Sequence, residues 1–185
     1  MAFEQFVPPP QGWAPPSAGL THSQLMGIGA VVSAWAVLEA VLQDALVALA
    51  KSPLTLGQAL TEDLGPDNRL KALRRLCQTW QIIMKGRNAE QSEMLDEVAA
   101  IGVWIEKQKG LRNQVAHWQW MRQTDHLAFG FKYSTKPANP AGTATNFMTA
   151  HTTDFTDFAG EISDKAGELI ELIADLRKLP PWPER

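Results

Sequence analysis

The stretch from Thr21 to Ala50 restricts the fold of this chain more than any other part of the sequence. Its apolar residues recur every three or four positions, which is the period of one helical face. They are Leu25, Ile28, Val31, Val32, Trp35, Leu38, Leu42, Leu46 and Leu49. Thr21 and Gln24 have the spacing of a capping box, so the sequence predicts that a helix begins directly after Thr21. The surface of this helix is apolar nearly all round, which indicates a central helix or one in a subunit interface.

Three more segments show helical periodicity. Gly65-Pro66 predicts the start of a second long helix, because proline is favoured in the first helical turn, and Gly86 ends it. The pattern predicts a third long helix from about residue 89 to about residue 117, and a fourth from about residue 153 to about residue 178. Residues 54–64 can hold a short helix. We therefore predict a mainly α protein, built as a bundle of four to five helices.

The sequence pattern changes from helical to alternating after residue 117. Residues 118–122 and 127–133 alternate with a period of two on either side of the polar segment 123–126. We therefore predict a small β-hairpin directly after the third long helix. Prolines and a glycine within residues 134–146 predict that this segment forms a loop.

Both ends of the chain are rich in proline. Residues 1–19 contain five prolines and residues 179–185 contain three, and such compositions favour extended chain without a core of its own. A length of 185 residues suggests one domain. We therefore predict a helical domain over residues 20–178 between two extended tails, which can act as arms that dock on a partner.

Several classes of site are excluded by simple features. The single cysteine, Cys77, excludes an intramolecular disulfide and a thiolate metal site. His22, His126 and His151 do not have the spacing of metal ligands, and the sequence contains no glycine-rich phosphate loop. We therefore expect no metal and no cofactor. The N-terminus has no secretory pattern, and the apolar run Leu25 to Leu38 is too short to span a bilayer. We expect a soluble, cytoplasmic protein with no membrane partner.

The strongest candidate for chemistry is Arg112-Asn113-x-x-x-His117, at the end of the third long helix. Asn113 and His117 are four positions apart, so they lie on one helix face and can touch. Arg112 lies about 140° round the helix from His117, but its long side chain can reach an anion held there. Arginine donates paired hydrogen bonds to phosphate, and histidine moves protons near neutral pH. With Asn113 beside them, these groups can support attack of an RNA 2′-hydroxyl on the adjacent phosphate.

Three residues near this motif are candidates for contacts with RNA. Lys109 and Arg122 lie in a basic stretch of the chain around the motif, and Trp118 can stack on a base. Structural interpretations stay open for all of these residues. The motif residues can cap the end of a helix, where a cationic histidine is favoured by the helix dipole, and Trp118 can pack within the hairpin.

The motif and its position in the predicted fold resemble those of the HEPN domain family. The resemblance covers roughly residues 20–178 and rests on the Arg-Asn-x-x-x-His order, on the hairpin after the third helix, and on Trp35-x-x-x-Glu39 in the first helix. It implies a metal-independent ribonuclease that leaves a 2′,3′-cyclic phosphate and a 5′-hydroxyl. It also implies a homodimer in which the motifs of two subunits face one cleft.

Two classes of function are therefore predicted. The first is an RNA-cleaving or RNA-binding protein of the HEPN type, in a toxin or defence system and with an antitoxin or another protein as partner. The second is a non-catalytic helical dimer that serves as a protein-interaction module. The exposure of Arg112 and His117 in a common cleft distinguishes the first class from the second.

Overall fold

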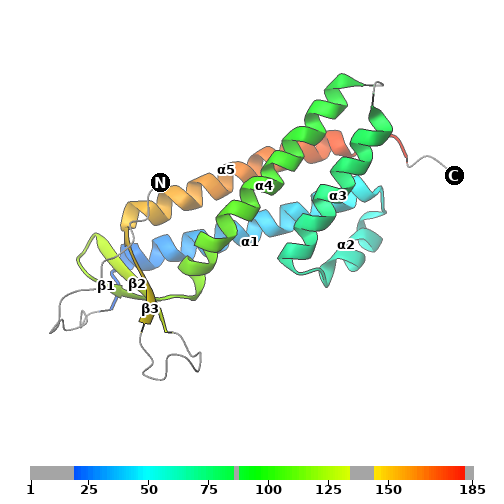
Figure 1. Cartoon of the computed structure of the whole chain (residues 1–185). Helices are drawn as coiled ribbons and strands as arrows, with labels where there is room; N and C mark the ends of the chain where they lie inside the picture. Colours follow the sequence, from blue (N-terminus) through cyan, green and yellow to red (C-terminus); the bar gives the residue numbers. More distant parts are fainter. Residues whose placement is uncertain (1–18, 86–87, 134–143, 182–185) are drawn as a thin grey trace. The chain divides into compact units, whose positions relative to one another are not determined.

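The computed structural model describes residues 19–85, 88–133 and 144–181, and Figure 1 labels its helices and strands. Within these ranges the chain forms five helices and three strands, in the order α1 (His22–Ala50), α2 (Leu54–Glu62), α3 (Pro66–Met84), α4 (Ala89–His117), β1 (Gln119–Arg122), β2 (Leu127–Tyr133), β3 (Ala144–His151) and α5 (Thr152–Leu176). The prediction of a mainly α protein with four to five helices is confirmed. Of the two proline-rich tails, residues 1–18 and 182–185 lie outside the described residues.

The described chain divides into two compact units. We call residues 19–35 and 110–162 the mixed unit, because it contains the sheet, and residues 36–109 and 163–181 the helical unit. The long helices α1, α4 and α5 each contribute one part to the mixed unit and another to the helical unit.

The helical unit is held together by close packing of large apolar side chains between helices. Trp80 of α3 is fully buried, and its indole Nε1 donates a hydrogen bond of 2.8 Å to the Leu49 carbonyl oxygen of α1. A glycine allows α2 to approach α1, because a Cβ atom on Gly57 would lie only 2.6 Å from Val47 Cγ1. The hydrogen bond to Leu49 gives the buried indole N–H of Trp80 a partner, and without one this group would lower stability.

Helix α1 ends at Ala50, directly before Lys51-Ser52-Pro53. Lys51 has a φ of 53°, in the left-handed region that often terminates helices. Its Nζ donates hydrogen bonds of 3.0 Å to the carbonyl oxygens of Leu176 and Arg177, at the end of α5. These bonds satisfy carbonyl groups that have no partner within α5 itself.

The mixed unit contains an antiparallel sheet with the strand order β1-β2-β3. The predicted hairpin is confirmed, since β1 pairs with β2 in a register that places Met121 opposite Phe129. The prediction of a loop through residue 146 is wrong at its end, because β3 begins at Ala144 and pairs with β2. An isolated two-stranded hairpin is marginally stable, and β3 pairs with the edge of β2 that β1 leaves open. Figure 1 shows β3 running directly into α5.

Aromatic residues join the sheet to the helices of the mixed unit. The ring of Trp120 packs edge-on against Phe155 of α5, with 5.0 Å between ring centroids. Trp120 also covers Gly130 on β2, where an added Cβ would lie 2.8 Å from the indole ring. Gly27 of α1 lets Phe155 approach in the same way, because a Cβ there would lie 2.9 Å from Phe155 Cβ. The indole Nε1 of Trp120 donates to the Val115 carbonyl oxygen at 3.0 Å, which ties β1 to the end of α4.

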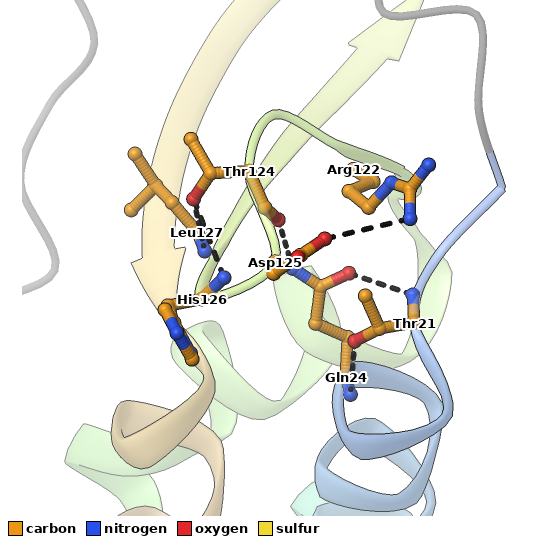
Figure 2. Close-up of polar contacts among 7 residues, drawn as sticks. All are labelled: Thr21, Gln24, Arg122, Thr124, Asp125, His126 and Leu127. Carbon is orange, nitrogen blue, oxygen red and sulfur yellow. Dashed lines mark hydrogen bonds and ion pairs between the residues drawn. The ribbon is translucent and has the colours of Figure 1, made fainter.

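The predicted capping box at the start of α1 is confirmed. The Gln24 backbone N–H donates to Thr21 Oγ1 at 3.2 Å, and the Thr21 N–H donates to Gln24 Oε1 at 2.9 Å. The Gln24 side chain is fully buried, and its Nε2 donates a bond of 3.0 Å to the Thr124 carbonyl oxygen. Figure 2 shows that this bond fixes the start of α1 to the turn between β1 and β2.

Helix α1 is long and apolar enough to cross a membrane by length and composition alone. Only 33% of its most apolar stretch is buried inside the protein. Core helices of water-soluble proteins and signal sequences pass the same test, so this property by itself is weak evidence for a membrane location.

Candidate functional site

A hollow of about 410 Å³ opens beside the end of α4, within the mixed unit. Its lining comes from the last two turns of α4, from the residue that follows the helix, and from β2. These residues are Gly110, Asn113, Gln114, His117, Trp118 and Lys132. We call this the α4-end hollow.

Asn113 and His117 lie on the face of α4 that borders the hollow. Both side chains are exposed to solvent, and both line the same cavity. Their spacing of four positions puts them on one helical face, as the sequence predicts. Trp118 follows directly, and its backbone N–H donates to the Gln114 carbonyl oxygen at 3.0 Å, which continues the helical turn. The end of a single helix therefore presents an imidazole, an amide and an indole to one opening.

Arg112 does not line the hollow. Its Nη1 donates a hydrogen bond of 3.1 Å to Asn113 Oδ1, and its Cζ lies 5.9 Å from the centroid of the Trp35 ring. The distance to Trp35 is that of a cation–π contact. Its Nε is buried and donates to no acceptor among the described residues. The guanidinium is thus linked to the hollow through the amide of Asn113.

The three predicted RNA contacts have different positions. Trp118 lines the hollow, half-buried, whereas Lys109 and Arg122 do not line it. Lys109 lies in the helical unit, where its Nζ is 2.7 Å from Asp67 Oδ1. Arg122 Nη1 lies 3.5 Å from Asp125 Oδ1 in the β1–β2 turn, and Figure 2 shows the two side chains facing each other. Only one of the three is therefore brought to the Asn113 and His117 side chains.

Lys132 is the charged residue of the hollow that sequence reasoning missed. It is exposed on β2 and lines the cavity opposite the helix end. The hairpin contained a usable signal, because Gln119 pairs with Phe131 and the next step of that register sets residue 132 beside residue 118. An assumed register for the predicted hairpin would have placed Lys132 next to Trp118.

The polar groups of the hollow suit an anion with an attached ring system. Lys132 supplies a positive charge, Asn113 supplies amide donors, and Trp118 offers an aromatic face on which a base can stack. His117 supplies an imidazole, the side chain that most often transfers protons in general acid–base catalysis. Within the described residues, no three His, Cys, Asp or Glu side chains come together in a way that could hold a metal ion.

Cys77 is not a second candidate for catalysis. It lies buried in α3 within the helical unit. Burial raises the pKa of its thiol to about 12, and the negative charge of Asp96 adds to this effect. The reactive thiolate form is therefore scarce at neutral pH, and the residue acts as part of the core.

A comparison with protein-family models gives no match, and comparisons with curated proteins and with solved structures give no significant match.

Proposed function

We propose that this protein is a HEPN-like, metal-independent endoribonuclease that binds single-stranded RNA in the α4-end hollow. The observation that carries the proposal is the gathering of His117, Asn113, Trp118 and Lys132 around one opening. A proton-transfer group, an amide donor, a cation and a stacking surface are the parts that such a reaction needs. The Arg-Asn-x-x-x-His order at the end of α4, which resembles the HEPN motif, adds support.

The proposed reaction is an internal transfer of the phosphate. The RNA 2′-oxygen forms a bond to the adjacent phosphorus, and the bond between phosphorus and the 5′-oxygen breaks. A neutral His117 imidazole accepts the proton of the 2′-hydroxyl, and an imidazolium donates a proton to the departing 5′-oxygen. The products are a 2′,3′-cyclic phosphate and a 5′-hydroxyl, without oxidant or metal. Two copies of His117 in a dimer supply one imidazole of each kind.

A homodimer is part of the proposal because α1 has an apolar face that is exposed in the single chain. Within the mixed unit, Leu25 is 55% exposed and Met26 is 61% exposed, and Val32 on the same helix is exposed too. Exposed apolar groups along one helix are typical of a surface that another protein covers. We propose that a second copy covers this face and that the protein is soluble in the cytoplasm. Light scattering at micromolar concentration should give about twice the chain mass, whereas a monomer contradicts the dimer.

The test of catalysis is cleavage of labelled single-stranded RNA in EDTA by the purified wild type and two variants. His117→Ala should keep the fold and the dimer but lose about 100- to 10,000-fold in cleavage rate, the usual contribution of general acid–base catalysis. Arg112→Lys should also be impaired, because a compact ammonium cannot replace the planar fork that bonds Asn113. Equal cleavage by all three proteins would point to a contaminating nuclease.

The second candidate function is a non-catalytic, HEPN-like helical dimer that acts as a protein-interaction module. The observation that favours it is the engagement of Arg112 by groups of its own chain, Asn113 and Trp35. A correctly folded wild-type dimer that cleaves none of a broad set of RNAs would favour this module over the ribonuclease.

The biological setting that we propose is a toxin or defence system in which an antitoxin or another protein restrains the enzyme. Expression of the wild type alone should then arrest growth of a bacterial host, and expression of His117→Ala at the same level should not. Equal growth of both cultures would count against this setting.

A further inference from the structure

We infer that Lys132 is the residue that binds the phosphate in the α4-end hollow, and that Arg112 is a positioning residue that acts through Asn113. The inference rests on the proposed function for the nature of the ligand, a phosphodiester of single-stranded RNA. The positive charge that contacts the phosphate is thus that of Lys132 on β2 rather than that of Arg112 on α4.

The first support is the position of Lys132. The β1–β2 register places Gln119 opposite Phe131, so Lys132 is the next residue towards the end of α4. It lines the same hollow as His117 and Asn113. A flexible lysine on the strand that faces the helix end can therefore reach a phosphate held between the two elements.

The second support is that Lys132 has no competing partner among the described residues. Two other basic side chains near the motif in sequence are engaged in ion pairs, Lys109 with Asp67 and Arg122 with Asp125. The ammonium group of Lys132 is exposed to solvent and lies in no such pair within the described ranges. It is available for an incoming anion, and binding would not first require a protein ion pair to break.

The third support concerns Arg112, whose guanidinium is already engaged. One Nη donates to Asn113 Oδ1, the plane lies near the Trp35 ring, and Nε is buried. Because Asn113 Oδ1 accepts from Arg112, the amide presents its Nδ2 hydrogens as the donors that remain for a phosphate oxygen. Arg112 therefore fixes which end of the Asn113 amide serves the ligand, and it does not itself need to touch the ligand.

The experiment measures binding of a fluorescent 2′-O-methyl oligonucleotide, which lacks the attacking hydroxyl and so cannot be cleaved by this reaction. Lys132→Met should lower the affinity about tenfold. It should also reduce the slope of log K against log salt concentration by about 0.7, the contribution of one phosphate contact on a single strand. Lys132→Arg should restore most of the affinity. Lys107→Met, an exposed lysine of α4 outside the hollow, is the control with the same change in net charge.

The role of Arg112 is tested in the same assay by a double-mutant cycle. Arg112→Met should weaken binding but leave the salt slope as in wild type, because no phosphate contact is lost. In the background of Asn113→Ala it should have little further effect, because the amide through which it acts is gone. Additive losses, together with a smaller salt slope for Arg112→Met, would show that Arg112 contacts the phosphate and would overturn the inference. Circular dichroism checks that each variant is folded.

The outcomes separate this inference from the proposed catalysis. Binding that depends on Lys132, in a protein that cleaves no unmodified RNA, would leave the inference standing and remove the ribonuclease. Cleavage by the wild type, with Lys132→Met and Lys107→Met equal in affinity and slope, would overturn the inference alone. A folded wild type that binds no RNA would overturn both.

Discussion

In the mixed unit, two basic side chains beside the α4-end hollow lie in no ion pair among the described residues, whereas Arg122 of the same unit and several basic side chains of the helical unit are paired. In the helical unit, Arg74 pairs with Glu106 and Lys109 pairs with Asp67. In the mixed unit, His117 and Lys132 border an open hollow and have no carboxylate partner among the described residues. Charge density along the sequence does not reveal this difference, because Lys109 and His117 are on the same helix. Ion pairing therefore separates Lys109 from the two side chains at the hollow, which have no carboxylate to displace when a ligand binds.

Two tryptophans, one from each unit, differ in their burial. Trp80 is fully buried in the helical unit and bonds a backbone carbonyl, whereas Trp118 of the mixed unit is half-buried at the hollow. An aromatic side chain buried on all sides contributes to stability alone. One with a face towards solvent can also contact a ligand.

The largest expected effect on stability is that of Trp80→Ala. The substitution empties a large site and leaves the Leu49 carbonyl without its donor, so the free energy of unfolding should fall by about 3–5 kcal/mol. Trp118→Ala should cost about 1 kcal/mol, because half burial of an apolar side chain is worth about that much. Urea denaturation of both variants measures the difference. Equal losses would show that the hollow is as much a part of the core as the site of Trp80.

A smaller effect is expected of Gly130→Ala in the sheet. The new Cβ would lie 2.8 Å from Trp120, whose ring is held by its bond to Val115 and by Phe155. Overpacking of this kind costs about 1–3 kcal/mol. Gly160→Ala is the matched control, because a Cβ at this exposed position of α5 meets no atom within 4 Å. It should raise stability by up to about 1 kcal/mol. Thermal unfolding of the two variants should therefore shift in opposite directions.

The smallest effect is expected of Lys109→Met, which removes an exposed ion pair. The hydrogen bond and charge of Lys109 hold the pKa of Asp67 below its usual 3.8, and the hydrogen bond that Lys109 donates to Asp67 raises the pKa of Lys109 above its usual 10.5. A carboxyl group whose pKa is lowered by folding stabilises the folded state at pH values above its ordinary pKa. This contribution is lost as the pH falls through the lower pKa of the folded state. An ammonium group whose pKa is raised by folding stabilises the folded state at pH values below its ordinary pKa. This contribution is lost as the pH rises through the higher pKa of the folded state.

The difference in unfolding midpoint between wild type and Lys109→Met should therefore be small near neutral pH and absent in strong acid. The difference should also shrink in 1 M salt, where the screening length falls to about 3 Å. A large difference that persists in salt would mean that surface cations of the helical unit matter more than the comparison of the two units implies.

Much of the fold could be predicted because its signals are local. Thr21 and Gln24 indicated the start of α1, Pro66 indicated the start of α3, and the predicted ends of α4 agree with the structure. Helix formation depends on residues within about four positions, so capping and periodicity suffice. The strand β3 could not be predicted in the same way. Its partner is β2, and pairing across an intervening segment leaves no short-range pattern.

The candidate site was predicted for residues that lie in α4 or directly after it. The helical period brings Asn113 and His117 to one face, which the spacing alone requires. The helical period could not show that Lys109 would pair with Asp67, which is 42 positions away in the sequence. It also could not show that Arg112 would lie near Trp35 and bond Asn113 instead of reaching past the helix end.

The sequence by itself determined which segments become helices, where most of them begin and end, and that a hairpin follows α4. These outcomes depend on hydrogen bonds and side-chain patterns within one segment. The tertiary structure alone decided that Lys109 and Arg122 are engaged elsewhere and that Arg112 lies beside Trp35. Such outcomes depend on which surfaces meet when distant segments pack, and charge pairing and burial are properties of those surfaces.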